Sequence, residues 1–249
     1  MYKLGLVSIS FKKNTVEEIF EVVKDAGLSY IEWGSDVHAP NDNEEKLKNI
    51  ANLQRKYGIG CSSYGTYFKL DVTPIEELEN YIKAAKILGT DILRLWCGSK
   101  SSAEYTDTEK QNLFSVCRKA AKIAEKNNVK LCMECHLGTF TDEINAALEL
   151  MNEVDSKNFK MYWQPNQSKG FDENRLYAEL IAPYTENIHV FNWEGMDRYP
   201  LIDAEDKWKK YLSYFNGDQV LLLEFMPNDN IEELKTEAQT LIKIKGDNK

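Results

Sequence analysis

The sequence lacks long hydrophobic runs, clustered positive charge and segments of low complexity. No stretch of its 249 residues approaches the roughly 20 consecutive apolar residues of a membrane-spanning helix, so we expect no membrane association. The first residues lack the apolar core of a signal peptide and predict a strand instead. The formal net charge of −9 argues against binding of nucleic acid, although it leaves room for a local pocket that takes an anionic substrate.

Cysteine, histidine and proline are also scarce. The five cysteines are an odd number, and Cys61, Cys132 and Cys135 fall in or beside predicted strands, which is typical of buried thiols in a reducing cytoplasm. Three histidines are too few for a DNA-repair nuclease that holds several zinc ions. Because no Pro- or Gly-rich linker interrupts the chain, we predict a single domain over residues 1–249. The cysteine usage predicts a cytoplasmic location.

Predicted strands and helices alternate along the whole chain. A capping box at Thr15 and Glu18 opens the first helix, and Gly27 ends it. The predicted strands are Leu4–Ser8, Tyr30–Trp33, Ile59–Tyr64, Asp91–Trp96, the start of Val129–Asp142, Phe159–Trp163, Asn187–Trp193 and Gln219–Phe225. One unit per roughly 31 residues favours an α/β fold of the (β/α)8 TIM-barrel type. A doubly wound open sheet is the alternative, but no GxGxxG motif follows the first strand.

The stretch Val129–Asp142 carries the strongest chemical signal. A short apolar run ends at Glu134, and His136 follows two residues later, on the same side of an extended strand. The run Gln219–Phe225 repeats this pattern, with four apolar residues before Glu224. Because the C-terminal ends of barrel strands carry the chemistry, we predict that the two carboxylates belong to one active site.

Other side chains near strand ends are candidates for binding a substrate. They are Glu32, His38, Tyr64, Arg94, Trp96, His136, Gln167 and Arg198. Several of these have a structural alternative, since buried glutamates commonly pair with a cation such as Arg94 or Lys69, and His38 could make only a structural hydrogen bond. In strand seven, His189 and Asn192 fall on opposite faces, and we predict that Asn192 faces inward while His189 faces the helices.

With these strand ends, the chain resembles the sugar-phosphate isomerase and epimerase group of xylose isomerase-like TIM barrels. The resemblance implies a divalent metal ion held by a Glu, an Asp, a His and a Glu from strands five to eight. Glu134 and Glu224 match the two glutamates, whereas Gln164 and Asn192 stand at the Asp and His positions. Arg198 matches an arginine that holds the sugar in some epimerases. A further His of the group falls on Gln167 in this chain.

Two amides therefore replace a carboxylate and an imidazole in the implied metal site. Amide oxygens bind hard cations without adding charge, so the set Glu134, Gln164, Asn192 and Glu224 favours Mn²⁺, Mg²⁺ or Co²⁺ over zinc. Without a metal ion the two carboxylates would repel each other and raise one pKa, which still leaves an acid/base pair.

The resemblance implies isomerisation or epimerisation of a small sugar, sugar phosphate or polyol. The proton would move through an enediolate between Glu134 and Glu224, with the metal ion assisting. The replaced ligands support an alternative, a barrel that has lost catalysis and binds a carbohydrate or other metabolite without metal. The sequence is compatible with a monomer and with a homo-oligomer.

Overall fold

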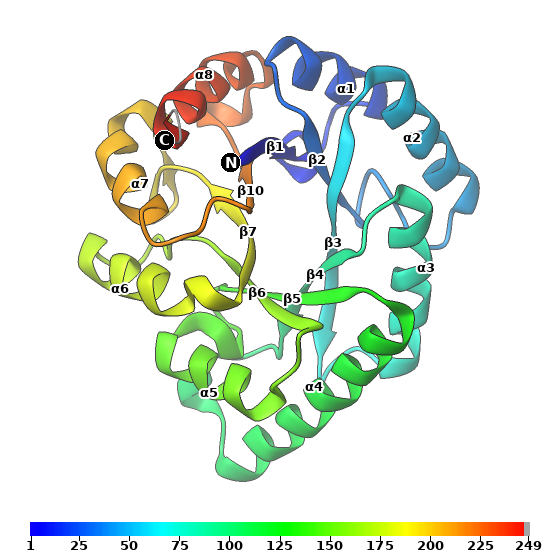
Figure 1. Ribbon diagram of the computed structural model, residues 1–249, viewed down its shortest axis with the longest axis vertical. Helices are drawn as coiled ribbons and strands as arrows, with labels where there is room; N and C mark the ends of the chain where they lie inside the picture. Colours follow the sequence, from blue (N-terminus) through cyan, green and yellow to red (C-terminus); the bar gives the residue numbers. More distant parts are fainter. Residues whose placement is uncertain (247–249) are drawn as a thin grey trace.

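The computed structural model describes residues 1–246 and confirms the expected (β/α)8 TIM barrel. Eight parallel strands close on one another in the order β1-β10-β7-β6-β5-β4-β3-β2 (Figure 1). These strands are β1 Lys3–Val7, β2 Tyr30–Gly34, β3 Gly60–Leu70, β4 Ile92–Cys97, β5 Lys130–Glu134, β6 Phe159–Trp163, β7 Thr185–Val190 and β10 Val220–Leu223. The missing numbers belong to a short antiparallel hairpin, β8 Trp193–Glu194 and β9 Asp197–Arg198, which follows β7.

In the described part of the chain, eight α-helices form a ring outside the strands (Figure 1). They are α1 Val16–Asp25, α2 Glu44–Tyr57, α3 Leu78–Leu88, α4 Asp107–Asn127, α5 Ile144–Val154, α6 Phe171–Ile181, α7 Glu205–Leu212 and α8 Leu234–Lys245. Their ends follow the local sequence. The capping box predicted at Thr15 and Glu18 is formed, and Thr106 with Glu109 forms another at the start of α4. Asn128, in the left-handed conformation, ends α4.

Alternate side chains of each barrel strand face opposite layers. The outward side chains, among them Trp33, Leu93 and Met133, pack with the helices in one large apolar cluster. A smaller apolar cluster, which includes Cys132 and Leu222, fills the barrel interior. Nearer the C-terminal ends of the strands the inward positions become polar, and this change of chemistry places the candidate site at that end of the barrel.

The five cysteines are all free thiols. Only two residues separate Cys132 from Cys135, yet Cys132 belongs to the interior cluster and Cys135 to the outer one. Burial raises the pKa of Cys135 to about 12. Both the geometry and the protonated state of Cys135 therefore fit a packing role for these thiols.

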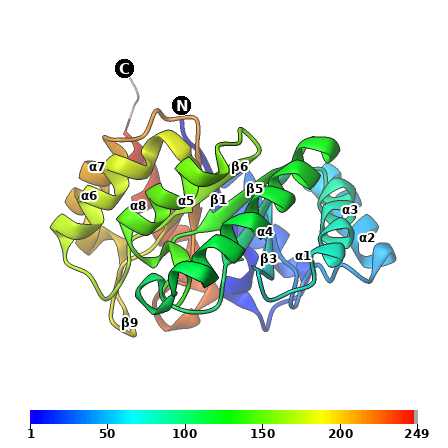
Figure 2. The same ribbon diagram turned by 90° about the horizontal axis from the view of Figure 1, so that it is seen from below.

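The hairpin β8–β9 marks the end of the barrel that carries the site. Figure 2 shows it projecting on the side opposite the chain termini. The C-terminal ends of the strands point toward the same side, which follows from the parallel arrangement. Within residues 1–246 no helix is both long enough and apolar enough to cross a bilayer.

Candidate active site

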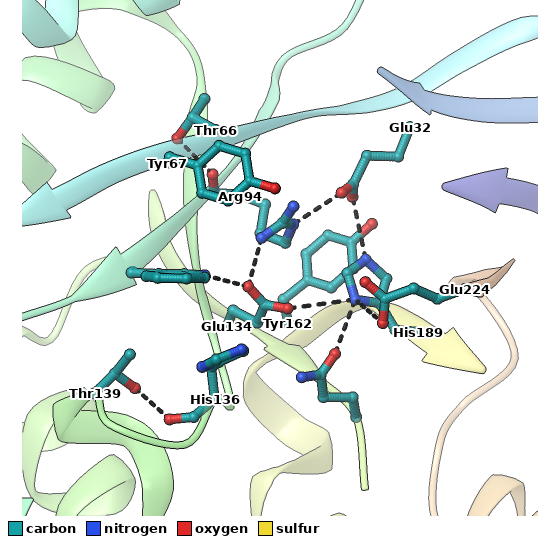
Figure 3. A network of polar contacts seen from close by, with 12 residues as sticks. Glu32, Thr66, Tyr67, Arg94, Glu134, His136, Thr139, Tyr162, His189 and Glu224 are labelled. Atoms are coloured by element: carbon teal, nitrogen blue, oxygen red, sulfur yellow. Dashed lines mark hydrogen bonds and ion pairs between the residues drawn. The ribbon is translucent and has the colours of Figure 1, made fainter. Parts of the chain in front are cut away.

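Four polar side chains converge at the C-terminal mouth of the barrel. Glu134 ends β5, Gln164 follows β6, His189 lies in β7 and Glu224 follows β10. The Nδ1 atom of His189 lies 2.9 Å from the amide oxygen of Gln164. It also lies 3.5 Å from Glu134 Oε1 and 3.4 Å from Glu224 Oε2 (Figure 3). Segments spaced widely along the chain therefore present one nitrogen and three oxygens to a single point.

The prediction for strand seven was wrong. His189 is fully buried and faces the barrel interior, in register with the inward-facing Leu222 of β10. The strand ends at Val190, so Asn192 lies beyond it, where its amide donates a hydrogen bond to the carbonyl of Pro200 at 2.9 Å. An irregularity in the pairing of β6 with β7 accompanies this register, and it could not be anticipated from alternation alone.

These residues fit a divalent cation. With His189 in the place expected of Asn192, the candidate ligands are two carboxylates, one imidazole and one amide oxygen, a set that suits Mn²⁺ or Co²⁺ and is harder than typical zinc sites. Ligand atoms of Glu134, His189 and Glu224 lie within 4.8 Å of one another. The other carboxylate oxygen of Glu134 accepts hydrogen bonds from Arg94 and Trp96, which leaves Oε1 turned toward His189.

The buried charges shift one another's pKa values. Burial alone would lower the pKa of His189, but the carboxylates of Glu224 and Glu32 raise it to about 10. Burial opposes ionisation of Glu134 too, yet Arg94 and His189 hold its pKa at about 2. For Glu224, burial dominates and raises the pKa, with repulsion from Glu134 adding to the effect. The two carboxyl groups are therefore unequal, as an acid/base pair requires.

Arg94 and Glu32 form a buried support beneath this cluster. The Arg94 guanidinium donates to Glu32 Oε1 at 2.8 Å and also pairs with Glu134. The ion pair considered as a structural alternative for Glu134 is therefore present, although Glu134 also lines the catalytic pocket. Glu32, which is fully buried, also accepts a hydrogen bond from Ser63 and faces His189 Nε2 at 3.5 Å. A carboxylate behind an imidazole fixes the orientation of the ring.

Gly65 of β3 makes room for this ion pair. A Cβ atom at Gly65 would lie 2.5 Å from Glu32 Oε1 and 2.9 Å from Arg94 Nη2. Both distances are shorter than real Cβ contacts, and the two side chains they concern are held on every side. The absence of a side chain at this position is thus a condition for the Glu32–Arg94 contact.

A cavity of about 220 Å³, here called the catalytic pocket, opens over the cluster. Arg94, Trp96, His136 and Gln167 line it as predicted, together with Glu134 and Glu224. The indole of Trp96 stacks on the imidazole of His136 with their centres 4.6 Å apart. Thr139 donates to the carbonyl of His136 and holds the loop after β5 (Figure 3). Gln164 adds one more polar group, and the other wall positions are aromatic or apolar: Ile9, Tyr67, Phe191, Trp193 and Phe225.

Four predicted contacts lie outside the catalytic pocket. One of them, Glu32, is fully buried beneath it and does not line it. Tyr64 is aligned with the outward-facing Trp33, and its hydroxyl donates to the carbonyl of Ala39 at 2.6 Å in the helix layer. His38 is buried with both ring nitrogens engaged, one with the hydroxyl of Ser8 and the other with the carbonyl of Asn14. Arg198 lines a neighbouring pocket and pairs with Asp229.

Tyr162 is another inward side chain that the sequence did not predict. Tyr162 lies inside the barrel, with its ring centre 4.7 Å from that of His189 and its hydroxyl 3.0 Å from that of Ser63. Burial raises the pKa of Tyr162 well above its usual value. Because Tyr162 stands two residues before Gln164, alternation from that amide would have placed it on the inward face.

Comparison with known proteins adds a family context to this geometry. Residues 20–213 match the family model described as the xylose isomerase-like TIM barrel. A 3-dehydroshikimate dehydratase of Bacillus anthracis is 26% identical over 212 residues, which cover 78% of this chain and 73% of that protein.

Solved structures agree on the fold. The probable 3-DHS dehydratase AsbF of Bacillus anthracis, involved in petrobactin synthesis, superimposes with a TM-score of 0.83 at 20% identity, covering 97% of this chain and 98% of that one. An L-ribulose 3-epimerase gives 0.75 at 14% identity over 98% of this chain and 94% of its own. A protein called IolI with a bound zinc atom gives 0.76 at 15% identity over 98% of each chain. At such identities these similarities establish the fold alone.

Proposed function

The chain belongs to the xylose isomerase-like TIM barrel family, and we propose that it is an enzyme that isomerises or epimerises a small sugar or polyol. The convergence of Glu134, Gln164, His189 and Glu224 beneath an aromatic-walled pocket carries this proposal. The name of the similar L-ribulose 3-epimerase supports it, since that protein acts on a sugar.

Glu134, Gln164, His189 and Glu224 are the residues that would hold a divalent metal ion. When bound, such an ion acts as a Lewis acid toward neighbouring carbonyl and hydroxyl oxygens. Arg94 and Trp96 fix the carboxylate of Glu134, so its orientation does not depend on the ligand. The aromatic side chains that line the pocket exclude water, and those not stacked on a neighbour can offer flat faces to a sugar ring.

The two glutamates divide the proton transfer between them. Glu134, whose pKa is low, is ionised and takes the proton from the carbon next to the substrate carbonyl. Glu224, the second carboxyl group of the cluster, gives a proton to the resulting enediolate. The substrate loses one proton to Glu134 and gains another from Glu224, so the net reaction is isomerisation or epimerisation. Glu134 then releases its proton to solvent and Glu224 takes one up, which returns both carboxyl groups to their initial states.

A second candidate is the loss of water from a hydroxy ketone. The 26% identity to a 3-dehydroshikimate dehydratase, over 78% of this chain, favours it. Both reactions begin when Glu134 removes a proton next to a carbonyl. In a dehydration the carbon–oxygen bond at the adjacent carbon then breaks, and Glu224 protonates the departing hydroxyl as water.

Solvent-exchange measurements on the metal-loaded protein test both candidates. The protein is first dialysed against Mn²⁺, and its metal content is measured by mass spectrometry. D-Fructose, D-psicose and 3-dehydroshikimate are then incubated with it in D₂O and followed by NMR. Deuterium appearing next to the carbonyl of a sugar supports epimerisation, whereas an alkene formed with loss of water supports dehydration.

The matched variant Glu134→Gln should abolish either reaction and lower the metal content. Glu143→Gln, an exposed glutamate before α5, serves as the control. A wild-type protein that binds sugar but exchanges no deuterium would contradict the proposed enzyme. If Glu134→Gln then binds the sugar equally well, the barrel is a binding module.

A further inference from the structure

A second pocket lies beside the catalytic pocket and has a different chemistry. Its volume is about 390 Å³, and it shares Ile9 and Phe225 with the catalytic pocket as common wall. Lys12 and Lys13, which precede α1, line one side, and Arg198 of the hairpin lines another. We call it the basic pocket.

The basic pocket concentrates positive charge on a protein whose net charge is −9. Three cationic side chains line it against one carboxylate, that of Asp229. Asp229 pairs with Arg198, and Lys12 contacts Asp36 at 2.9 Å and the hydroxyl of Tyr67 at 3.5 Å. Lys13 has no ion pair within the described part of the chain. The acidic neighbours therefore leave a surplus of positive charge facing the cavity.

Phe225 joins the two pockets and is held in an unusual conformation. Its φ of 50° lies in the left-handed region, which residues other than glycine rarely adopt. Its N–H donates to the hydroxyl of Ser10 at 2.9 Å, and the Arg198 guanidinium lies 4.6 Å from the centre of its ring. Strain of this kind persists where the surroundings enforce it, commonly at functional sites. Phe225 follows Glu224 in the sequence, and this backbone conformation places its ring against Arg198 of the basic pocket.

Size and charge indicate one ligand that spans both pockets. The catalytic pocket alone is smaller than the roughly 300–1,000 Å³ of typical small-molecule sites, and the two pockets together fall within that range. The basic pocket offers positive charge to an anionic group without using the residues that would hold the metal ion.

We propose that the basic pocket binds an anionic group, a phosphate or a carboxylate, on the substrate whose carbonyl end reacts in the catalytic pocket. This inference rests on the proposed function and names its substrate class: an acidic sugar derivative. Lys12, Lys13 and Arg198 provide charged hydrogen-bond donors for the oxygens of either group, and the planar guanidinium of Arg198 can bind two of them at once.

Three probes that differ at one carbon test the inference on the Mn²⁺-loaded protein. D-Fructose, D-fructose 6-phosphate and D-fructuronate carry a hydroxymethyl, a phosphate ester and a carboxylate at C6, respectively. Isothermal titration should show at least one of the anions binding about tenfold more tightly than fructose, with an affinity that falls as salt rises. The preferred anion identifies which group the pocket takes.

The variants Lys12→Ala, Lys13→Ala and Arg198→Ala should each lose most of that advantage, while fructose binding changes less than about twofold. Lys119→Ala, an exposed lysine of α4, is the matched control, and circular dichroism melts verify folding of each variant. If all three probes bind equally, or if the variants lose as much affinity for fructose as for the anions, the basic pocket does not bind an anionic group. The proposed function would be unaffected by that result. If fructose and both anionic sugars fail to bind and to react, the proposed function fails. Titration with inorganic phosphate then tests the pocket by itself, and no binding overturns it.

Discussion

The two faces of the same eight strands have opposite chemistry. The outward face carries residues such as Trp33 and Leu221 and packs against the helices without charge. The inward face near the mouth carries Glu32, Arg94 and Glu134, all buried and charged. Apolar burial supplies most of the stability of a fold, whereas a buried ion pair contributes little net free energy over an apolar replacement. The outward-facing residues therefore supply most of the stability of the barrel, and the inward-facing residues near the mouth supply the groups of the candidate active site.

The largest expected effect comes from removing the cation that serves both carboxylates. Arg94→Met leaves Glu32 and Glu134 buried without the guanidinium that pairs with both, so it should lower the free energy of unfolding by about 3–5 kcal/mol. Urea denaturation measures the change. Arg175→Met, on the surface of α6, should cost less than about 1 kcal/mol. If the two variants lowered the free energy of unfolding equally, the buried ion pairs of Arg94 would matter no more for stability than a surface ion pair.

Glu134→Gln should separate chemistry from stability. The side chain keeps its shape, while the proton acceptor is lost, so kcat should fall by about 10²–10⁴-fold. The free energy of unfolding should change far less than in Arg94→Met. The amide oxygen of Gln can still accept a hydrogen bond from Arg94, and Arg94 keeps its ion pair with Glu32. Kinetics and denaturation on the same preparation give the comparison. A retained kcat would remove Glu134 from the mechanism.

Leu221→Ala should give the reverse pattern. Leu221 is a fully buried, outward-facing residue of β10, and its truncation leaves a cavity that should cost about 2–5 kcal/mol of unfolding free energy. Activity per folded molecule should stay within about twofold of the wild type, since no group of the catalytic pocket is altered. A selective loss of kcat with unchanged stability would show that the two faces are not independent.

Tyr64→Phe is a smaller test of the outer layer. The substitution removes one hydrogen bond to the carbonyl of Ala39 and should destabilise the fold by about 1 kcal/mol. Because the side chain faces the helices, KM and kcat should not change. A raised KM would restore the expectation that Tyr64 contacts the substrate.

The smallest effect is expected at Asn192. Its amide caps only the carbonyl of Pro200, so Asn192→Ala should leave the bound-metal content unaltered. His189→Ala, measured alongside, should weaken metal binding by about tenfold or more. Loss of metal in Asn192→Ala with retention in His189→Ala would reverse the assignment made from the structure.

The sequence predicted the barrel because hydrophobic runs, caps and turn residues recur at a regular spacing. Glu134 and Glu224 were found for the same reason: a carboxylate at the end of an apolar run is a local signal. The direction of His189 is not local. It depends on where β7 ends and on how it pairs with β6, and a shift of one residue exchanges the two faces of a strand.

Strand β3 shows the same limit. It extends through Leu70, beyond the predicted end at Tyr64, and the inward position beside Glu32 is taken by Ser63. A serine next to a tyrosine gives no hint of which one faces the interior. The hydrogen bond from Ser63 to Glu32 is decided by the packing of two strands, so only the structure could identify it.

Gly65 shows what the inner layer demands of a residue that takes no part in chemistry. The space above its Cα is filled by the Glu32–Arg94 pair, so every other amino acid would displace one of the two charges. In a genetic screen for loss of function, alleles at Gly65 would group with those of Arg94 and Glu134. Gly65 thus tolerates no substitution even though it has no functional group. A mutation there would have the same phenotype as the loss of an active-site residue.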